Sequence, residues 1–227
     1  LYEAAGDEFP HAWQELLDAA RPFADFHEPG KNGDSELPKN TLPQIISANE
    51  LCAKDLLEPL QVISGLLHQG AKMSLGGGSK SFKTWTLLQM AVCIATKREW
   101  LGFETCGNPV IFINLELPEW SIKRRTELIC QAMEIPVPKE LRFWNLRGYS
   151  CNSEELFSKL TKEIDKYGYV GGFLDPIYKI LGTKDENSAR DVGLILNAVE
   201  KFTVETKMSA IYGAHFSKGN QSAKEAM

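Results

Sequence analysis

The chain has 227 residues, of which 43% are hydrophobic and 24% are charged, and its 25 basic and 30 acidic side chains give a net charge of −5. This composition is typical of a globular protein with a sizeable core, and it excludes a disordered chain, a collagen and a small disulfide scaffold. A net negative charge provides no overall positive field for binding nucleic acid, although a local basic loop can still bind it.

Cysteine use and hydropathy restrict the compartment. Five cysteines are scattered between Cys52 and Cys151 without a C-x-x-C pair, so a disulfide framework and a zinc knuckle are not indicated and a reducing, cytoplasmic location is favoured. No apolar run approaches the roughly 20 residues of a membrane helix, and a signal-peptide pattern is absent, so we expect no membrane partner. Because the chain begins at Leu1 instead of methionine, we expect it to be part of a longer protein.

The N-terminal part differs from the rest of the chain. Apolar residues recur at helical spacing from Trp13 to Ala20 and predict a short amphipathic helix, which Pro22 ends. Residues 27–43 are polar and rich in glycine and proline, a composition typical of a linker. We therefore expect residues 1–46 to form a helix and an arm, and residues 47–227 to form the main domain.

Strand-like and helix-like segments alternate after this arm. The expected strands are residues 72–75, 110–115, 141–146, 168–174 and 209–213. The expected helices are residues 84–97, residues 118–133, a helix capped by Ser153 with Glu154 and Glu155 in its first turn, and residues 188–206. This order predicts right-handed crossovers and an α/β fold, in which a mostly parallel sheet is flanked by helices on both faces.

A glycine-rich loop, G-G-G-S-K-S-F-K-T, joins the first strand to its helix, which is where a phosphate-binding P-loop lies. Compared with G-x-x-x-x-G-K-[ST], Gly77 is the first glycine, and Phe82 departs from the pattern by replacing the second. We expect Lys83 to reach the β- and γ-phosphates of ATP and Thr84 to bind Mg²⁺. Lys80 is either an auxiliary phosphate contact or a solvated lysine. The expected nucleotide-binding residues are Gly77, Gly78, Ser79, Lys80, Ser81, Phe82, Lys83, Thr84 and Trp85.

Three polar residues follow other predicted strands, at the sheet edge where open α/β folds bind ligands. Asp175 ends an apolar strand and supplies the carboxylate that Mg²⁺ needs, although an Asp-Pro turn is the alternative. Glu116 follows V-I-F-I-N-L and is either the base that activates the attacking water or a solvated glutamate. His215 is a candidate sensor of the γ-phosphate or a structural histidine.

Four ordered segments together resemble a known family. They are G-G-S-K-S-F-K-T-W-T-L-L, V-I-F-I-N-L-E-L, G-G-F-L-D-P-I-Y-K-I-L with D-E-N-S-A, and A-I-Y-G-A-H-F-S-K-G-N. They are similar to the RepA-like branch of the RecA/DnaB-type ATPases, hexameric helicases of plasmid and phage replication modules. The resemblance implies a RecA-like P-loop NTPase fold in which Lys83 and Thr84 bind phosphate and Mg²⁺, Asp175 is the Walker B acid, Glu116 is the catalytic glutamate and His215 is the sensor.

The resemblance also implies partners. A ring of identical subunits, a hexamer as in the family, would hold single-stranded DNA with two loops that correspond to residues 182–191 and 216–221, whose basic residues are Lys184, Arg190 and Lys218. These few charges suffice when several subunits contribute them, so an isolated chain should bind DNA weakly. The family's arginine or lysine finger is expected beyond Met227, and without it ATP hydrolysis should be slow.

Two other functions fit parts of the sequence. A small-molecule phosphotransferase on the same core would need an arginine-rich lid, for which only Arg124 and Arg125 are nearby, within a predicted helix. A non-catalytic, nucleotide-dependent interaction module is suggested by Phe82 and by the N-terminal helix and arm.

Overall fold

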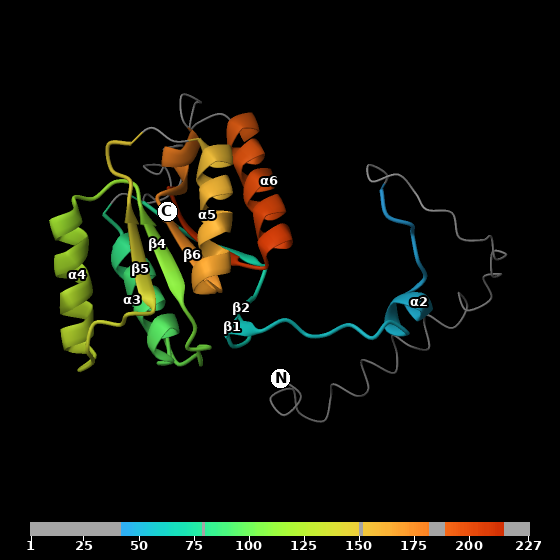
Figure 1. Ribbon diagram of the computed structural model, residues 1–227, viewed down its shortest axis with the longest axis horizontal. Helices are drawn as coiled ribbons and strands as arrows, with labels where there is room; N and C mark the ends of the chain where they lie inside the picture. The colour runs from blue at the N-terminus through green and yellow to red at the C-terminus, as the bar shows by residue number, and fades with distance from the viewer. Residues whose placement is uncertain (1–41, 79, 150–151, 182–188, 216–227) are drawn as a thin grey trace, which may run out of the picture. The chain divides into compact units, whose positions relative to one another are not determined.

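The structure is a computed structural model, and it describes residues 42–78, 80–149, 152–181 and 189–215 (Figure 1). The chain divides into two compact units, residues 1–55 and 56–227. The helix expected around residues 13–20 lies outside the described residues, and the boundary expected after residue 46 stays a prediction. No helix within the described residues has the length and hydrophobicity needed to span a bilayer.

The described part of the first unit contains one short helix, α2 (Ala48–Cys52). Ser47 caps it, because the Ser47 hydroxyl accepts a hydrogen bond from the backbone N–H of Glu50 at 3.2 Å and the Glu50 carboxylate accepts one from the N–H of Ser47 at 2.7 Å. The backbone N–H and the hydroxyl of Ser47 both donate to the Glu50 carboxylate, and these two hydrogen bonds lower the pKa of that carboxyl group. The helix buries none of its residues, so local capping is what stabilises it.

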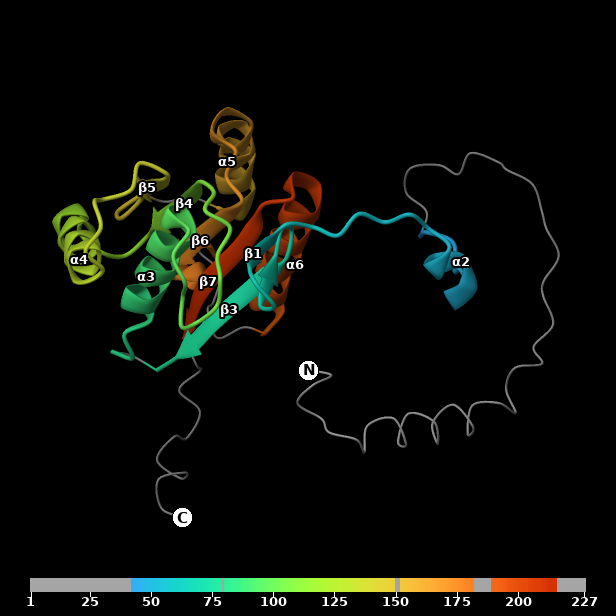
Figure 2. The same cartoon turned by 90° about the horizontal axis from the view of Figure 1, so that it is seen from below.

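The second unit is built on a five-stranded sheet in the order β3-β7-β6-β4-β5, and all of its neighbouring strands are parallel. Figure 2 shows β3 and β5 at opposite edges of this sheet. The strands are β3 (Lys72–Gly77), β4 (Val110–Asn114), β5 (Leu141–Asn145), β6 (Gly171–Asp175) and β7 (Ser209–His215). The helices between them are α3 (Lys83–Thr96), α4 (Glu119–Ala132), α5 (Ser153–Tyr167) and α6 (Ala189–Thr206), with a 3-10 helix, η2 (Ile177–Leu181).

Helices cover both faces of the sheet, as predicted. Figure 1 shows α3 and α4 on one face and α5 and α6 on the other. Side chains of β4 alternate between the two cores, because successive residues of a strand point to opposite faces. Phe112 belongs to the core beneath α3 and α4, whereas Ile111 and Ile113 belong to the core beneath α5 and α6. This α/β architecture, a parallel sheet between two layers of helices, agrees with the RecA-like P-loop NTPase fold that the sequence analysis expects.

The sequence placed these strands and helices correctly but missed some of their ends. Asn152, not Ser153, caps α5, and its side-chain oxygen accepts a hydrogen bond from the N–H of Glu155 at 2.9 Å. Gly168 was expected to begin a strand, yet it ends α5 with a left-handed φ of 67°, and β6 begins only at Gly171. Asparagine and serine cap helices about equally well, and glycine is common just after a helix, so the pattern alone did not separate these alternatives.

A two-stranded antiparallel hairpin, β1 (Gln61–Ile63) and β2 (Leu67–His68), precedes β3 and was not predicted. Its turn contains Gly65, whose φ is 71°. Val62, Ile63 and Leu67 are buried in the core beneath α3 and α4. The hairpin therefore belongs to the second unit and extends one of its two cores.

Phe112 tests the packing of this core. Its ring is fully buried and stacks on Phe173 of the neighbouring strand, with 5.8 Å between ring centroids. We expect Phe112→Ala to lower the free energy of unfolding by about 3–5 kcal/mol, because it removes apolar contacts and leaves a cavity. Urea unfolding measures this loss, and Phe103→Ala is the control because Phe103 is 40% exposed. Equal effects of the two substitutions would contradict the assigned packing.

Candidate functional site: a phosphate-binding loop beside a buried carboxylate

The N-terminus of α3 differs from the N-termini of α2 and α5. No side chain among the described residues caps it, and its first turn contains no acidic residue. By contrast, Ser47 caps α2 and Asn152 caps α5, and both of those helices carry glutamate in the first turn. The positive end of the α3 dipole and its first N–H groups are therefore available to an anion.

The loop before α3 is folded around the side chain of Lys83, which is 92% buried. The Lys83 ammonium group donates hydrogen bonds to the carbonyl oxygens of Gly77 at 3.0 Å and Gly78 at 2.7 Å, and it lies 3.3 Å from the hydroxyl oxygen of Ser81. A Cβ atom on Gly77 would lie 2.5 Å from that hydroxyl oxygen. A side chain at this first glycine of the motif would therefore force the Ser81 hydroxyl group to move.

Phe82, which replaces the second glycine of the motif, adopts the backbone conformation that favours glycine. Its φ is 60° and its ψ is 16°, in the left-handed region, and Lys80 also has a φ of 62°. The Phe82 side chain is 73% exposed, so its ring leaves the loop instead of filling it. The left-handed conformation costs about 1–2 kcal/mol in a residue with a side chain, and the loop keeps its shape despite this cost.

Asp175 is the last residue of β6 and is buried. A Cβ atom on Gly213 of the neighbouring strand β7 would lie 2.7 Å from a carboxylate oxygen of Asp175 and 3.4 Å from the Leu87 side chain of α3. The carboxylate therefore lies over Gly213, on the face of the sheet that α3 covers. Because β7 separates β6 from β3, and Gly213 pairs with Leu75, this position brings the carboxylate toward the strand that leads into the loop.

Glu116 lies just after β4, at the same end of the sheet as Asp175, and its side chain is exposed. Asn114, which the sequence analysis missed, fixes the turn that carries it. The Asn114 side chain is buried. Its amide nitrogen donates hydrogen bonds to the carbonyl oxygen of Leu117 at 2.7 Å and to the side-chain oxygen of Asn145 at 3.0 Å. Its amide oxygen accepts a hydrogen bond from the N–H of Leu117 at 2.9 Å. A polar residue at the end of the apolar run V-I-F-I-N was the signal that could have identified it.

The other expected site residues are only partly described. Ser79, Lys184 and Lys218 lie outside the described residues. For Arg190 and His215 only the backbone is described; His215 ends β7 and pairs in register with Gly77.

Thr84 and Trp85 lie in the first turn of α3 and are half-buried. The guanidinium carbon of Arg125, on α4, is 5.1 Å from the centre of the Trp85 ring. This contact engages one of the two arginines that a phosphotransferase lid would need, while Arg124 lies on the same helix. Both arginines named for such a lid therefore lie on α4.

Comparison with known proteins identifies the family of the chain. A family model for an AAA domain matches residues 43–221, so the chain belongs to that family of P-loop ATPase-type domains. Among solved structures, a KaiC-like protein from the hyperthermophilic archaeon Pyrococcus horikoshii OT3 is similar, with 16% sequence identity and a TM-score of 0.46. That alignment covers 69% of this chain and 66% of the archaeal one, just under two thirds of its length. No curated protein matches.

Phe82→Gly tests the loop conformation. We expect this substitution to leave the free energy of unfolding unchanged or to raise it by up to about 1 kcal/mol, because relief of the left-handed strain offsets the extra freedom of glycine in the unfolded chain. Val204→Gly is the control: Val204 is a half-exposed residue inside α6, where glycine should be destabilising by about 1 kcal/mol. A loss at position 82 as large as that at 204 would contradict the conformation of Phe82.

Proposed function

We propose that this chain binds ATP with Mg²⁺ at the loop before α3 and hydrolyses it. The observation that carries the proposal is the combination of an uncapped α3 N-terminus, the buried Lys83 ammonium group and the Asp175 carboxylate on the same face of the sheet. A helix N-terminus with a lysine suits phosphates, and a nearby carboxylate suits a hard divalent ion.

Each residue then has a defined role. The loop N–H groups and Lys83 would hold the β- and γ-phosphates, for which Lys83 exchanges its carbonyl contacts with Gly77 and Gly78 for phosphate oxygens. The Thr84 hydroxyl and Asp175 would hold Mg²⁺, which when bound neutralises charge on the phosphates. Glu116 would accept the proton of the attacking water at its carboxylate, and Asn114 would position Glu116 through the turn after β4.

The same proposal extends to assembly and DNA. The resemblance to RepA-like helicases supports a cytoplasmic, ring-shaped oligomer that acts on single-stranded DNA in replication, with Lys184, Arg190 and Lys218 contributed by several subunits. His215, opposite Gly77 in the sheet, would sense the γ-phosphate from the end of β7. A finger residue from a neighbouring subunit would complete each site, so fast hydrolysis requires the assembled protein.

Lys83→Ala tests nucleotide binding. Loss of the buried ammonium group should weaken Mg·ATP binding at least tenfold in isothermal titration calorimetry, since it removes a charge-assisted contact with phosphate. Lys139→Ala is the control, because the Lys139 side chain is 92% exposed on a different part of the domain. Circular dichroism of both variants checks that they fold. Equal ATP affinity of wild type and Lys83→Ala would refute the assignment.

Gly213→Ala tests the position of Asp175 without removing a charged group. The new methyl group would meet the Asp175 carboxylate, so we expect Mg²⁺-dependent ATP affinity to fall by about tenfold or more, while ATP binding without Mg²⁺ changes little. Gly193→Ala is a matched control, because a Cβ atom there meets nothing within 4 Å. If both variants retain wild-type Mg²⁺ dependence, Asp175 is not the metal ligand.

Glu116→Gln tests the catalytic role on the assembled protein. The amide cannot take up the proton, so we expect ATP binding to persist while single-stranded-DNA-stimulated hydrolysis falls by about 10²–10⁴-fold. Mass photometry of the same sample reports the assembly state. Undiminished hydrolysis by Glu116→Gln would remove Glu116 from the mechanism, and stimulation by a small metabolite instead of DNA would favour a phosphotransferase.

A further inference from the structure

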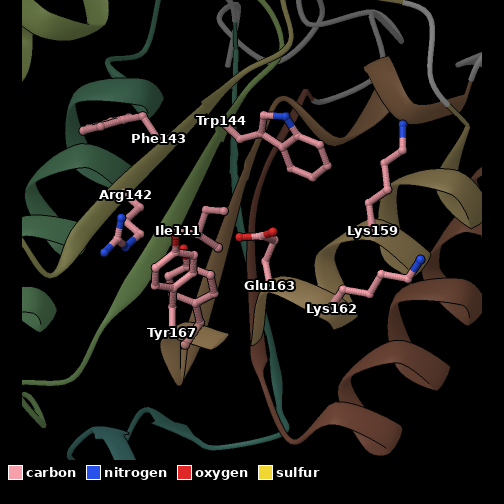
Figure 3. Close-up of a pocket in the computed structure, with 9 residues that line it drawn as sticks. Ile111, Arg142, Phe143, Trp144, Lys159, Lys162, Glu163 and Tyr167 are labelled. Atoms are coloured by element: carbon pink, nitrogen blue, oxygen red, sulfur yellow. The ribbon is translucent and has the colours of Figure 1, made fainter. Parts of the chain in front are cut away.

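A groove of about 450 Å³ lies on the α5 side of the edge strand β5 (Figure 3). Its lining includes Arg142 and Trp144 from β5, and Lys159, Lys162 and Glu163 from α5. Because β5 and β3 are at opposite edges of the sheet, this groove is separate from the phosphate-binding loop. A volume of this size is within the usual range for small-ligand sites, and none of the roles assigned above uses it.

The groove is basic in a chain that is acidic overall. Three cations line it, Arg142, Lys159 and Lys162, against the single carboxylate of Glu163. Lys159 also pairs with Glu155 one turn earlier on α5, at 2.7 Å. Burial raises the pKa of the Tyr169 phenol, which also lines the groove, to about 12, so that ring adds no negative charge at neutral pH. The electrostatic character of the groove therefore favours an anion.

Aromatic rings lie beside these cations. The guanidinium carbon of Arg142 is 3.8 Å from the centre of the Tyr167 ring, which fixes the planar cation in the groove wall. Figure 3 shows Glu163 between Arg142 and Tyr167 on one side and the two lysines on the other, with the half-buried Trp144 indole beside them. An exposed ring face can stack on a nucleobase, and lysines beside it can bind the attached phosphate.

We propose that this groove binds a nucleotide unit, an aromatic base joined to a phosphate, at a site distinct from the loop before α3. Trp144 stacks on the base, Lys159 and Lys162 bind the phosphate, and Glu163 accepts a hydrogen bond from the base or the sugar. The unit is either part of a single-stranded nucleic acid or a free nucleotide. An acidic peptide would satisfy the cations but would leave the aromatic wall without a stacking partner.

Two probes separate these sources, both used on the full chain without ATP or Mg²⁺. Fluorescence anisotropy measures binding of a labelled oligothymidylate, and calorimetry measures binding of thymidine monophosphate. We expect at least one probe to bind, and we expect Trp144→Leu and Lys162→Glu each to weaken that binding about tenfold, through loss of stacking and loss of a phosphate contact respectively. Binding of the oligonucleotide alone identifies a strand, and binding of the monophosphate identifies a free nucleotide.

Control variants make the result specific. Lys139→Glu introduces the same charge change at an exposed position outside the groove and should leave binding unchanged. Lys83→Ala should also leave it unchanged, so failure of the proposed ATP site and failure of this proposal are distinguishable. The proposal is overturned if neither probe binds, if the groove variants bind like wild type, or if oligoglutamate competes as well as the oligonucleotide.

Discussion

All five strands of the main sheet run in the same direction, so their carboxyl ends all lie at the same end of the sheet. This constraint places the loop after β3, Asp175 at the end of β6 and Glu116 just after β4 at the same end of the sheet, although almost 100 residues separate the loop from Asp175 in sequence. Successive side chains of a strand point to opposite faces of the sheet, so residues two apart share a face. Phe173 faces α3, and Asp175, two residues later, therefore lies on the same side.

Within the sheet and the loop, glycine residues leave the space that polar side chains of the site occupy. Gly213 leaves room for the Asp175 carboxylate over β7, and Gly77 leaves room for Ser81 inside the loop. Phe82 shows the opposite case, in which a large residue occupies a glycine conformation because its ring can remain in solvent. The glycine at this position of the motif therefore indicates a backbone conformation, and phenylalanine can adopt it as well. The departure at position 82 does not remove the loop.

Sequence patterns predicted the order of the five strands of the main sheet and of the four helices α3 to α6, the position of the loop and the place of Asp175 at a strand end, since each depends on local hydrophobic runs and on residues at strand ends. They did not predict the clearance at Gly213, because that requires the register of two strands that are distant in sequence. Asn114 was missed for a related reason: its role depends on Asn145 in the neighbouring strand. The groove beside β5 could not be predicted at all, since two separate elements, β5 and α5, form its walls.

The central claim is that Lys83 and Asp175 hold one Mg·nucleotide between them. The most direct measurement is a crystal structure of the chain with Mg²⁺ and a non-hydrolysable ATP analogue. We expect the Lys83 ammonium group to leave the carbonyl oxygens of Gly77 and Gly78 for the phosphates, with the ion at Thr84 and Asp175. A nucleotide bound elsewhere, with Lys83 still on those carbonyl oxygens, would contradict it.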